Sequence, residues 1–355
     1  MRVAGGTLGE FTTSQLRGLC EVVGIEDRHP VRLLEQLLST AASRPLTEPP
    51  LWPSDVADDA TPIEFSVQFD DNGQRHLRIL AETIAAQPSA SANLQAAQEF
   101  LDNVSREYDL ALDRLRSVQE LFLAEEPQGK FAWWYSFIFS PGKEPKFKVY
   151  FNPEVHGPER SREIVADSLD RLGLHEAYQT VEKYALQRGD KDHFAFFAVD
   201  LDHSPQSRVK IYVAQEEASA AVAERAAAAV PGIDPGQAGK FCSLLGGDTE
   251  IFAGRPLVSS YSFVEGDTST PSNYSVYVPI RDYVPHDGVA RERVLDTLPQ
   301  FGVEPTGLDE MIAAVRNRPL EANSGLIAHV SLRMSASTIG STVYLSSEAY
   351  GGTPR

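Results

Sequence analysis

The amino-acid sequence predicts an α+β protein in which ten antiparallel strands form one closed barrel with helices outside it. Three observations support this prediction. A short tyrosine pattern recurs four times at nearly equal spacing, each copy lies in the second strand of a predicted hairpin, and helical segments fill the gaps between hairpins. An internal repeat of this kind indicates that one structural unit is used several times.

The repeated tyrosines each follow a β-branched residue and precede an apolar one, a composition typical of strands. Their spacings along the chain are 62, 65 and 67 residues. The four copies are Val149-Tyr150-Phe151, Ile211-Tyr212-Val213, Val276-Tyr277-Val278 and Val343-Tyr344-Leu345.

A strand-like run and a turn precede each of these strands, so each pair is predicted to form a hairpin. A fifth hairpin lies upstream, with strands at 63–69 and 76–80 around the turn Asp70-Asp71-Asn72-Gly73. The first strands of the other four are predicted at 131–139, 193–199, 257–264 and 327–333.

Helical spacing of apolar residues fills the intervals between the hairpins. The predicted helices include Leu16, Leu19, Cys20 and Val23; a long stretch at 94–123; Val165, Leu169 and Leu172; an alanine-rich segment at 218–230; and a last main helix with Val294, Leu295 and Leu298.

The chain thus contains five units of helix, strand, strand, predicted to form a single domain at 11–350 with short tails at 1–10 and 351–355. Closing the sheet removes its edges, and a ring of ten strands can hold a small ligand. The alternatives are unrelated α/β sandwiches or two domains, which the length of 355 residues also allows.

Composition narrows the class of protein. The net charge of −18 argues against a general nucleic-acid or anionic-membrane binder, because both partners are polyanions. Two cysteines, Cys20 and Cys242, make neither a disulfide framework nor a zinc site. With no long apolar run and no signal-peptide core, we expect a cytoplasmic protein.

The motif scan finds no phosphate loop, no dinucleotide fingerprint, no HExxH, no GxSxG and no DDxxD cluster. The histidines are scattered, so no metal site is predicted. The pairs Asp58-Asp59 and Asp70-Asp71 are interpreted as solvated turn residues.

Cations and tyrosines share one face of the second strands, because residues i and i+2 point to the same side. If the barrel closes, they line its interior. Clustered cations can bind a diphosphate where no metal is present, and aromatic ring faces attract a carbocation. The alternative is that these side chains are solvated on the outer face. They are Arg78, Lys148, Arg208 and Lys210 with Tyr150, Tyr212, Tyr277 and Tyr344.

One acid, Glu64, lies in an otherwise largely apolar strand. It is interpreted either as a charge that protects a sheet edge from pairing or as a buried acceptor for a substrate N–H. The pattern alone favours neither.

Through these residues the sequence resembles the indole prenyltransferases of the dimethylallyltryptophan synthase family. Its length is similar to that of the compact bacterial members. The resemblance extends from about Leu8 to Tyr350. It rests on six stretches in order, at 61–66, 76–80, 148–153, 208–212, 277–279 with 281–283, and 343–350.

The resemblance implies the prenyltransferase αββα barrel and an allylic diphosphate bound without a magnesium requirement. It implies that the four cations hold the diphosphate, that the four tyrosines shield the allyl cation, and that Glu64 accepts the indole N–H. The sequence departs from the pattern of the fungal members at two places, which bear on the ring position that is alkylated and on the group that takes the final proton. Residues 132–136 contain no lysine where some fungal members have one, and Asn152 stands where several have a tyrosine.

We therefore expect an enzyme that transfers a dimethylallyl group from dimethylallyl diphosphate to the indole of L-tryptophan or a tryptophan-derived small molecule, such as a cyclic dipeptide or an indolactam. No cofactor is expected to be required, and both partners are small molecules. The alternatives are a prenyltransferase acting on a phenol or a peptide, and a non-catalytic barrel that binds a phosphorylated or aromatic ligand. Glu64 favours an N–H substrate over a phenol.

Overall fold

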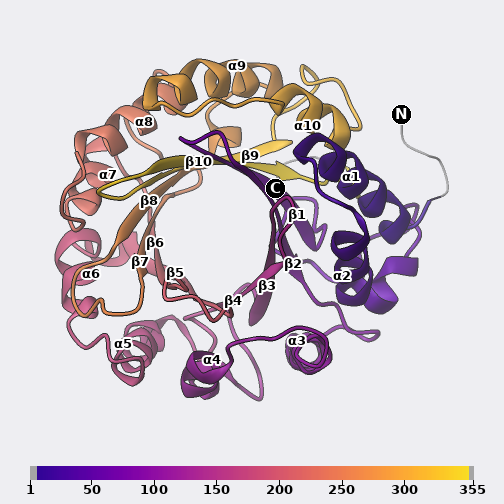
Figure 1. Ribbon diagram of the computed structural model, residues 1–355, viewed down its shortest axis with the longest axis horizontal. Helices are drawn as coiled ribbons and strands as arrows, with labels where there is room; N and C mark the ends of the chain where they lie inside the picture. Colours follow the sequence, from indigo (N-terminus) through magenta and orange to yellow (C-terminus); the bar gives the residue numbers. More distant parts are fainter. Residues whose placement is uncertain (1–5, 352–355) are drawn as a thin grey trace.

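A computed structural model describes residues 6–351, and the ten strands of that part of the chain form one closed antiparallel barrel (Figure 1). Each strand pairs with its neighbours in the chain, and β1 pairs with β10 to close the ring. The strands are β1 (Ile63–Asp70), β2 (Arg75–Glu82), β3 (Trp133–Phe139), β4 (Lys146–Phe151), β5 (Asp192–Asp200), β6 (Val209–Gln215), β7 (Leu257–Phe263), β8 (Asn273–Val278), β9 (Ile327–Met334) and β10 (Ile339–Ser346).

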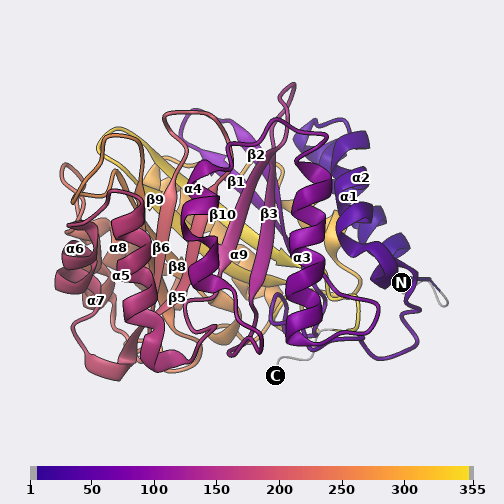
Figure 2. The same ribbon diagram turned by 90° about the horizontal axis from the view of Figure 1, so that it is seen from below.

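Ten α-helices of residues 6–351 surround the barrel in chain order (Figure 1), and Figure 2 shows three of them, α3, α4 and α5, standing along its outer wall. The predicted fold is therefore confirmed. The helices are α1 (Leu8–Val23), α2 (Arg28–Leu38), α3 (Ala90–Val104), α4 (Asp113–Val118), α5 (Ser161–Arg171), α6 (Ala177–Ala185), α7 (Ala220–Ala227), α8 (Gly236–Gly246), α9 (Asp287–Thr297) and α10 (Leu308–Val315).

The two faces of the strands differ in polarity, and this difference makes the interior a binding site rather than a core. Outward residues are apolar and buried under the helices. For example, Phe151 of β4 stacks on Phe122 with ring centroids 4.5 Å apart, and the Tyr135 hydroxyl donates to the Ala97 carbonyl at 2.7 Å. Inward residues are largely polar, and several remain partly exposed to the barrel interior, which we call the lumen. The main hydrophobic core lies between sheet and helices.

The predicted helical stretch at 94–123 is wrong in its length. The structure splits it into α3 and α4, with residues 105–112 as a loop whose Ala111 N–H donates to the Leu201 carbonyl at 2.9 Å. A continuous helix of thirty residues would be about 45 Å long, whereas the strands it covers have about eight residues and span about 27 Å. The helix containing Val294 and Leu295 is α9, and it is not the last, because α10 follows it.

The N-terminal boundary also differs from the prediction. Helix α1 begins at Leu8, with a capping box formed by its N-cap Thr7 and Glu10, so residues 8–10 belong to this helix and not to a tail. The predicted tails otherwise fall mainly on residues 1–5 and 352–355, which lie outside the described residues. Cys20 and Cys242 are both buried and unpaired. Between residues 6 and 351, no helix is long and apolar enough to span a bilayer.

The two ends of the barrel are different. All five hairpin turns lie at one end, the turn end, because every unit runs in the same direction. At the other end, which we call the floor, the segment 51–61 reaches the lumen, where Val56 packs with Trp134, Leu80 and Phe196. The C-terminal residues join this floor, since the Ala349 and Tyr350 N–H groups donate to Thr61 and Asp59.

Candidate active site

A cluster of cationic side chains occupies the lumen near the turn end. Asp200 of β5 lies at its centre, with Oδ1 2.9 Å from Lys148 Nζ and Oδ2 2.7 Å from Arg208 Nε. These contacts follow from the strand register, because Lys148 pairs directly with Asp200. Arg78 and Lys210 are close enough for their charges to act on the Lys148 ammonium. The structure therefore brings together the four cations that the sequence predicted to share one face.

A fifth cation, Arg333 of β9, was missed from the sequence. Its Nη2 lies 2.6 Å from Asp70 Oδ1, and its charge acts on Lys210. Asp70 also accepts from Gln68 at 2.6 Å, and Gln68 in turn accepts from Arg78. Asp70 is thus an internal partner of the cluster, and its interpretation as a solvated turn residue is wrong.

Positive charge exceeds negative charge in this part of the lumen, which affects the titration of its lysines. Burial, followed by the charge of Arg208, lowers the pKa of Lys148 to about 7, although Asp200 opposes the shift. Burial and the charges of Arg208 and Arg78 lower the pKa of Lys210 well below its usual value. Burial alone would raise the pKa of Asp200, but Arg208 and Lys148 hold it below its usual range. An anion bound here would restore the charge balance.

The cluster opens at the turn end through a cavity of about 230 Å³. Arg208, Arg333 and Asp200 line it, together with Lys146 and Asn273. This opening is polar, so a charged ligand can reach the cations from the turn end.

The four predicted tyrosines form a row in the middle of the lumen, on the successive even-numbered strands β4, β6, β8 and β10. The ring centroids of consecutive members are separated by 5.7 Å (Tyr150 to Tyr212), 5.8 Å (Tyr212 to Tyr277) and 6.0 Å (Tyr277 to Tyr344). Lys210 Nζ lies 4.9 Å from the Tyr212 ring centroid, so cations and rings meet directly. The row can therefore surround an organic cation beside a bound anion.

Glu64 lies on the floor side of this row. It is 6% exposed, and burial raises its pKa to about 8, although the charge of Arg281 opposes the shift. Its strand β1 pairs with β2 on one side and β10 on the other. The interpretation as a charge protecting a sheet edge is therefore wrong, because β1 has no free edge. In the described residues no hydrogen bond or ion pair occupies its carboxylate, which leaves it available to a ligand.

Near Glu64, Asp58 lies between two guanidinium groups. Its Oδ1 is 2.6 Å from Arg255 Nη2 and its Oδ2 is 3.0 Å from Arg281 Nε. Asp58 is thus a member of a partly buried charge network at the floor, and its interpretation as a solvated turn residue is wrong.

The first strands of the hairpins supply the residues that the sequence analysis missed. The i, i+2 rule, applied there only to the second strands, also places their polar and aromatic side chains in the lumen. Phe196, for example, packs edge-to-face against both Tyr150 and Tyr212. The missed residues on these strands are Trp134, Phe196, Asp200, His329 and Arg333.

The two departures from the fungal pattern have clear structural roles. Trp134 is a lumen-facing residue of the stretch without lysine, and its ring stacks on Phe131 at 4.0 Å. Asn152 holds the loop after β4, because its side chain donates to the Gln128 and Phe131 carbonyls at 3.1 and 2.7 Å.

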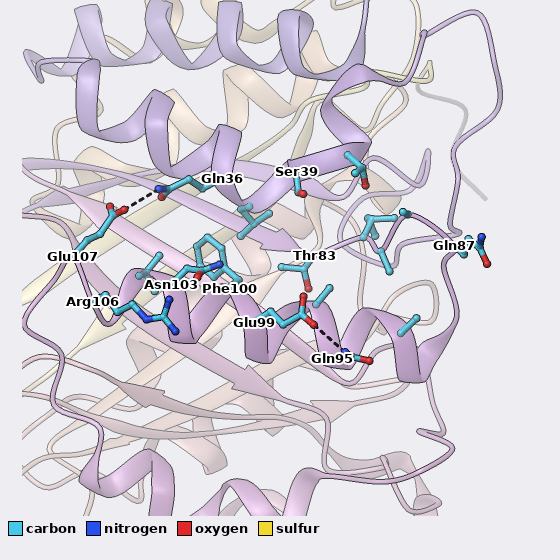
Figure 3. A pocket seen from close by; sticks show the side chains of 18 residues that line it. Gln36, Ser39, Thr83, Gln87, Gln95, Glu99, Phe100, Asn103, Arg106 and Glu107 are labelled. Carbon is cyan, nitrogen blue, oxygen red and sulfur yellow. Dashed lines mark hydrogen bonds between the residues drawn. The ribbon is translucent and has the colours of Figure 1, made fainter.

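A second hollow lies outside the barrel, between α2 and α3 (Figure 3), with a volume of about 800 Å³. A hydrogen bond from Gln36 to Glu107 joins two of its lining residues, and a second bond from Gln95 to Glu99 runs along α3. Its wall contains Arg106 together with these two glutamates and lacks the excess positive charge of the lumen. Across residues 6–351 no group of three or more His, Cys, Asp or Glu side chains could hold a metal ion. The lumen is therefore the candidate active site.

Comparisons with known proteins agree with this geometry. The family model for tryptophan dimethylallyltransferase matches residues 36–228. The structure of 6-dimethylallyltryptophan synthase from Micromonospora olivasterospora, in complex with DMASPP and Trp, is 47% identical, with a TM-score of 0.94 and coverage of 98% of this chain and 99% of that one. This chain belongs to the tryptophan dimethylallyltransferase family.

Other members of the family are similar over the same length. The ternary complex of the prenyltransferase PriB with L-tryptophan and dimethylallyl thiolodiphosphate is 35% identical, covers 98% of both chains and has a TM-score of 0.91. The 5-dimethylallyltryptophan synthase from Streptomyces coelicolor is 34% identical, with 99% of this chain and 98% of that chain covered and a TM-score of 0.90. The predicted resemblance and enzyme class are thus confirmed: this member of the family is a prenyltransferase, and the non-catalytic alternative is excluded.

Proposed function

We propose that this transferase moves a dimethylallyl group from dimethylallyl diphosphate to the indole ring of L-tryptophan without requiring a metal ion. The observation that supports this most is the order of groups along the lumen. The cation cluster lies near the turn end, the tyrosine row follows, and the buried carboxylate of Glu64 lies beyond it.

The donor places its diphosphate among Arg78, Lys148, Arg208, Lys210 and Arg333. When the bond between the allylic carbon and the diphosphate oxygen breaks, the electron pair stays on the diphosphate. The cations stabilise that developing charge where a metal ion otherwise would. The tyrosine rings face the allyl cation that remains and keep water from it.

The acceptor enters the floor side, where Glu64 accepts the indole N–H and makes the ring more electron-rich. A ring carbon attacks the allyl cation, the new carbon–carbon bond forms, and a base at the site then takes the proton that this carbon carried. Position 6 of the indole is the first candidate, because the 6-dimethylallyltryptophan synthase is 47% identical to this chain and the 5-dimethylallyltryptophan synthase 34%.

The experiment is the incubation of the purified protein with both substrates and excess EDTA, followed by liquid chromatography, mass spectrometry and NMR of the product. We expect monoprenylated tryptophan at an undiminished rate. Loss of turnover in EDTA that magnesium restores would refute metal independence. Turnover of tyrosine in place of tryptophan would support the phenol alternative. The cytoplasmic location expected from the sequence stays a prediction.

A further inference from the structure

Asp200 places a buried negative charge inside the cation cluster of the lumen. It is 4% exposed, and it lines the opening at the turn end together with Arg208 and Arg333. Arg208 and Lys148 hold the pKa of its carboxyl below the usual range, so the group is ionised near pH 7. A diphosphate bound by the cluster therefore lies close to a carboxylate that carries charge of the same sign.

Contacts within its own hairpin hold this carboxylate in place. Oδ2 accepts hydrogen bonds from the Arg208 backbone N–H at 3.1 Å and from Arg208 Nε at 2.7 Å. The Asp200 backbone N–H donates to the Arg208 carbonyl at 2.9 Å. The backbone bond to Oδ2 persists when a ligand engages the guanidinium, so the negative charge remains in the cluster.

Two of the cations that suit a diphosphate are already shared with Asp200. Its Oδ1 lies 2.9 Å from Lys148 Nζ, and its Oδ2 lies 2.7 Å from Arg208 Nε. A diphosphate can engage these cations either by displacing their contacts with Asp200 or by sharing the cations with it. Displacement loses ion pairs and sharing brings like charges together, so both arrangements weaken the binding.

The strands determine where the cations lie, independently of Asp200. Lys148 lies in β4 and Arg208 directly before β6, on the two neighbours of β5. Lys210 is positioned by the tyrosine row, with Nζ 4.9 Å from the Tyr212 ring centroid. A neutral residue at position 200 is therefore expected to keep the cations in the lumen and to remove the competing charge.

The consequence concerns the end of the catalytic cycle. A cluster that stabilises the leaving diphosphate also holds inorganic diphosphate after the transfer, and release of a product can limit the rate of an enzyme. Interactions that hold the substrate as strongly as the transition state do not accelerate the chemical step. A fixed carboxylate lowers the affinity for donor and product together, and it thereby speeds release.

We propose that Asp200 competes with the diphosphate for Lys148 and Arg208 and keeps inorganic diphosphate loosely held, so that its release is not slower than prenyl transfer. The inference rests on the proposed function, in which the cation cluster binds the diphosphate of the donor. Asp200 is a positioning residue in this account, because it acts through the two cations and not on the reacting carbon.

The first test is calorimetric titration of the wild type and of Asp200→Asn with inorganic diphosphate. A pH of about 6 is suitable, because Asp200 helps to keep Lys148 protonated and low pH compensates for its removal. Asp200→Asn is expected to bind inorganic diphosphate on the order of 10- to 100-fold more tightly, because charged hydrogen bonds taken up by Asp200 become available to the ligand.

Two further variants separate charge from structure. Asp200→Glu keeps the negative charge and is expected to bind inorganic diphosphate nearly as weakly as the wild type. Asp309→Asn is the matched control, because it removes the same charge from an exposed pair with Arg291 outside the barrel. It is expected to leave the affinity unchanged.

Rapid-quench kinetics with tryptophan and the donor give the second readout. The wild type is expected to form product without a burst in the first turnover. Asp200→Asn is expected to show a burst followed by a lower kcat, together with a lower KM for the donor, because release of diphosphate becomes the slow step.

Weaker or unchanged binding of inorganic diphosphate in Asp200→Asn would show that Asp200 only positions the cations, and it would overturn the inference. If that variant does not fold, the wild type decides: a burst in its first turnover would overturn the inference, and a linear onset would support it. If prenylated tryptophan forms but the affinity for diphosphate does not change, only this inference fails. If no indole is converted, the proposed function fails, and the titration still measures the effect of Asp200 on diphosphate binding.

Discussion

Raising the pH above 7 is expected to weaken binding of the prenyl donor, and Lys148 determines much of the effect. Burial and Arg208 lower the pKa of this lysine to about 7 in the free enzyme. A bound diphosphate places negative charge beside Nζ and raises that pKa, so each binding event above pH 7 takes up a proton. Affinity therefore falls as the pH rises from about 7 toward the pKa of the complex, by up to about tenfold per unit for one proton.

Calorimetric titration with dimethylallyl thiolodiphosphate, a donor analogue, measures this effect. Dissociation constants at about pH 7 and about pH 8.5 suffice, because the uptake of one proton changes the binding free energy by up to about 2 kcal/mol over this interval. Lys148→Arg keeps the positive charge but does not titrate in this range. Its affinity for the donor analogue is therefore expected to fall less steeply with pH, by the contribution of about one proton. Lys210, whose pKa is also lowered, accounts for any slope that persists. Equal affinity at both pH values in the wild type would refute the reasoning, and so would an unchanged slope in Lys148→Arg.

Three further predictions test other parts of the barrel. Burial raises the pKa of Glu64 to about 8, so the rate at saturating donor is expected to rise toward pH 8 as the carboxylate ionises, and this rise is expected to be absent in Glu64→Gln. At about pH 8 that variant is also expected to reduce kcat/KM for tryptophan at least several-fold, because a charged acceptor is replaced by a neutral one; unchanged affinity for the donor analogue is the control, and wild-type kinetics with tryptophan would contradict the assignment. Tyr344→Leu is expected to slow prenyl transfer about fivefold or more, whereas Tyr344→Phe is expected to retain most activity, because the ring face and not the hydroxyl stabilises the allyl cation. Equal rates of prenyl transfer in the two variants would count against cation stabilisation by the Tyr344 ring. Asp287→Ala is expected to lower the free energy of unfolding by about 3–5 kcal/mol in urea denaturation, because its buried carboxylate accepts three backbone N–H groups at 325–327 and pairs with Arg318; a loss below about 1 kcal/mol would contradict that reasoning.

The barrel could be predicted from the sequence because its strands alternate between an apolar outer face and a largely polar inner face. The alternation around Lys148 and Tyr150 is the same as that around Lys210 and Tyr212, so one repeat determines the fold and the orientation of its side chains. The break in the helical stretch after Val104 could not be predicted in this way, since the length of the barrel wall limits the helix and no local signal marks the break.

Two charge partners of the site, Asp58 and Asp70, could not be predicted either, because they come from turns and chain segments far away in the sequence. Asp58 and Asp70 have the neighbours of ordinary turn residues, yet they pair with Arg281 and Arg333, more than two hundred residues later. Only closure of the barrel between β1 and β10 brings Asp70 beside β9 and β10. Arg333, in contrast, was predictable, because its alternation with Ser331 and His329 marks an inward face.

The most direct test of the central claim is a crystal structure of this chain with dimethylallyl thiolodiphosphate and tryptophan bound together. The account predicts the diphosphate among Lys148, Arg208 and Lys210 near the turn end, the allyl group against the tyrosine row, and the indole N–H within hydrogen-bond distance of Glu64. Diphosphate at the floor beside Arg281, or an indole N–H pointing away from Glu64, would contradict it.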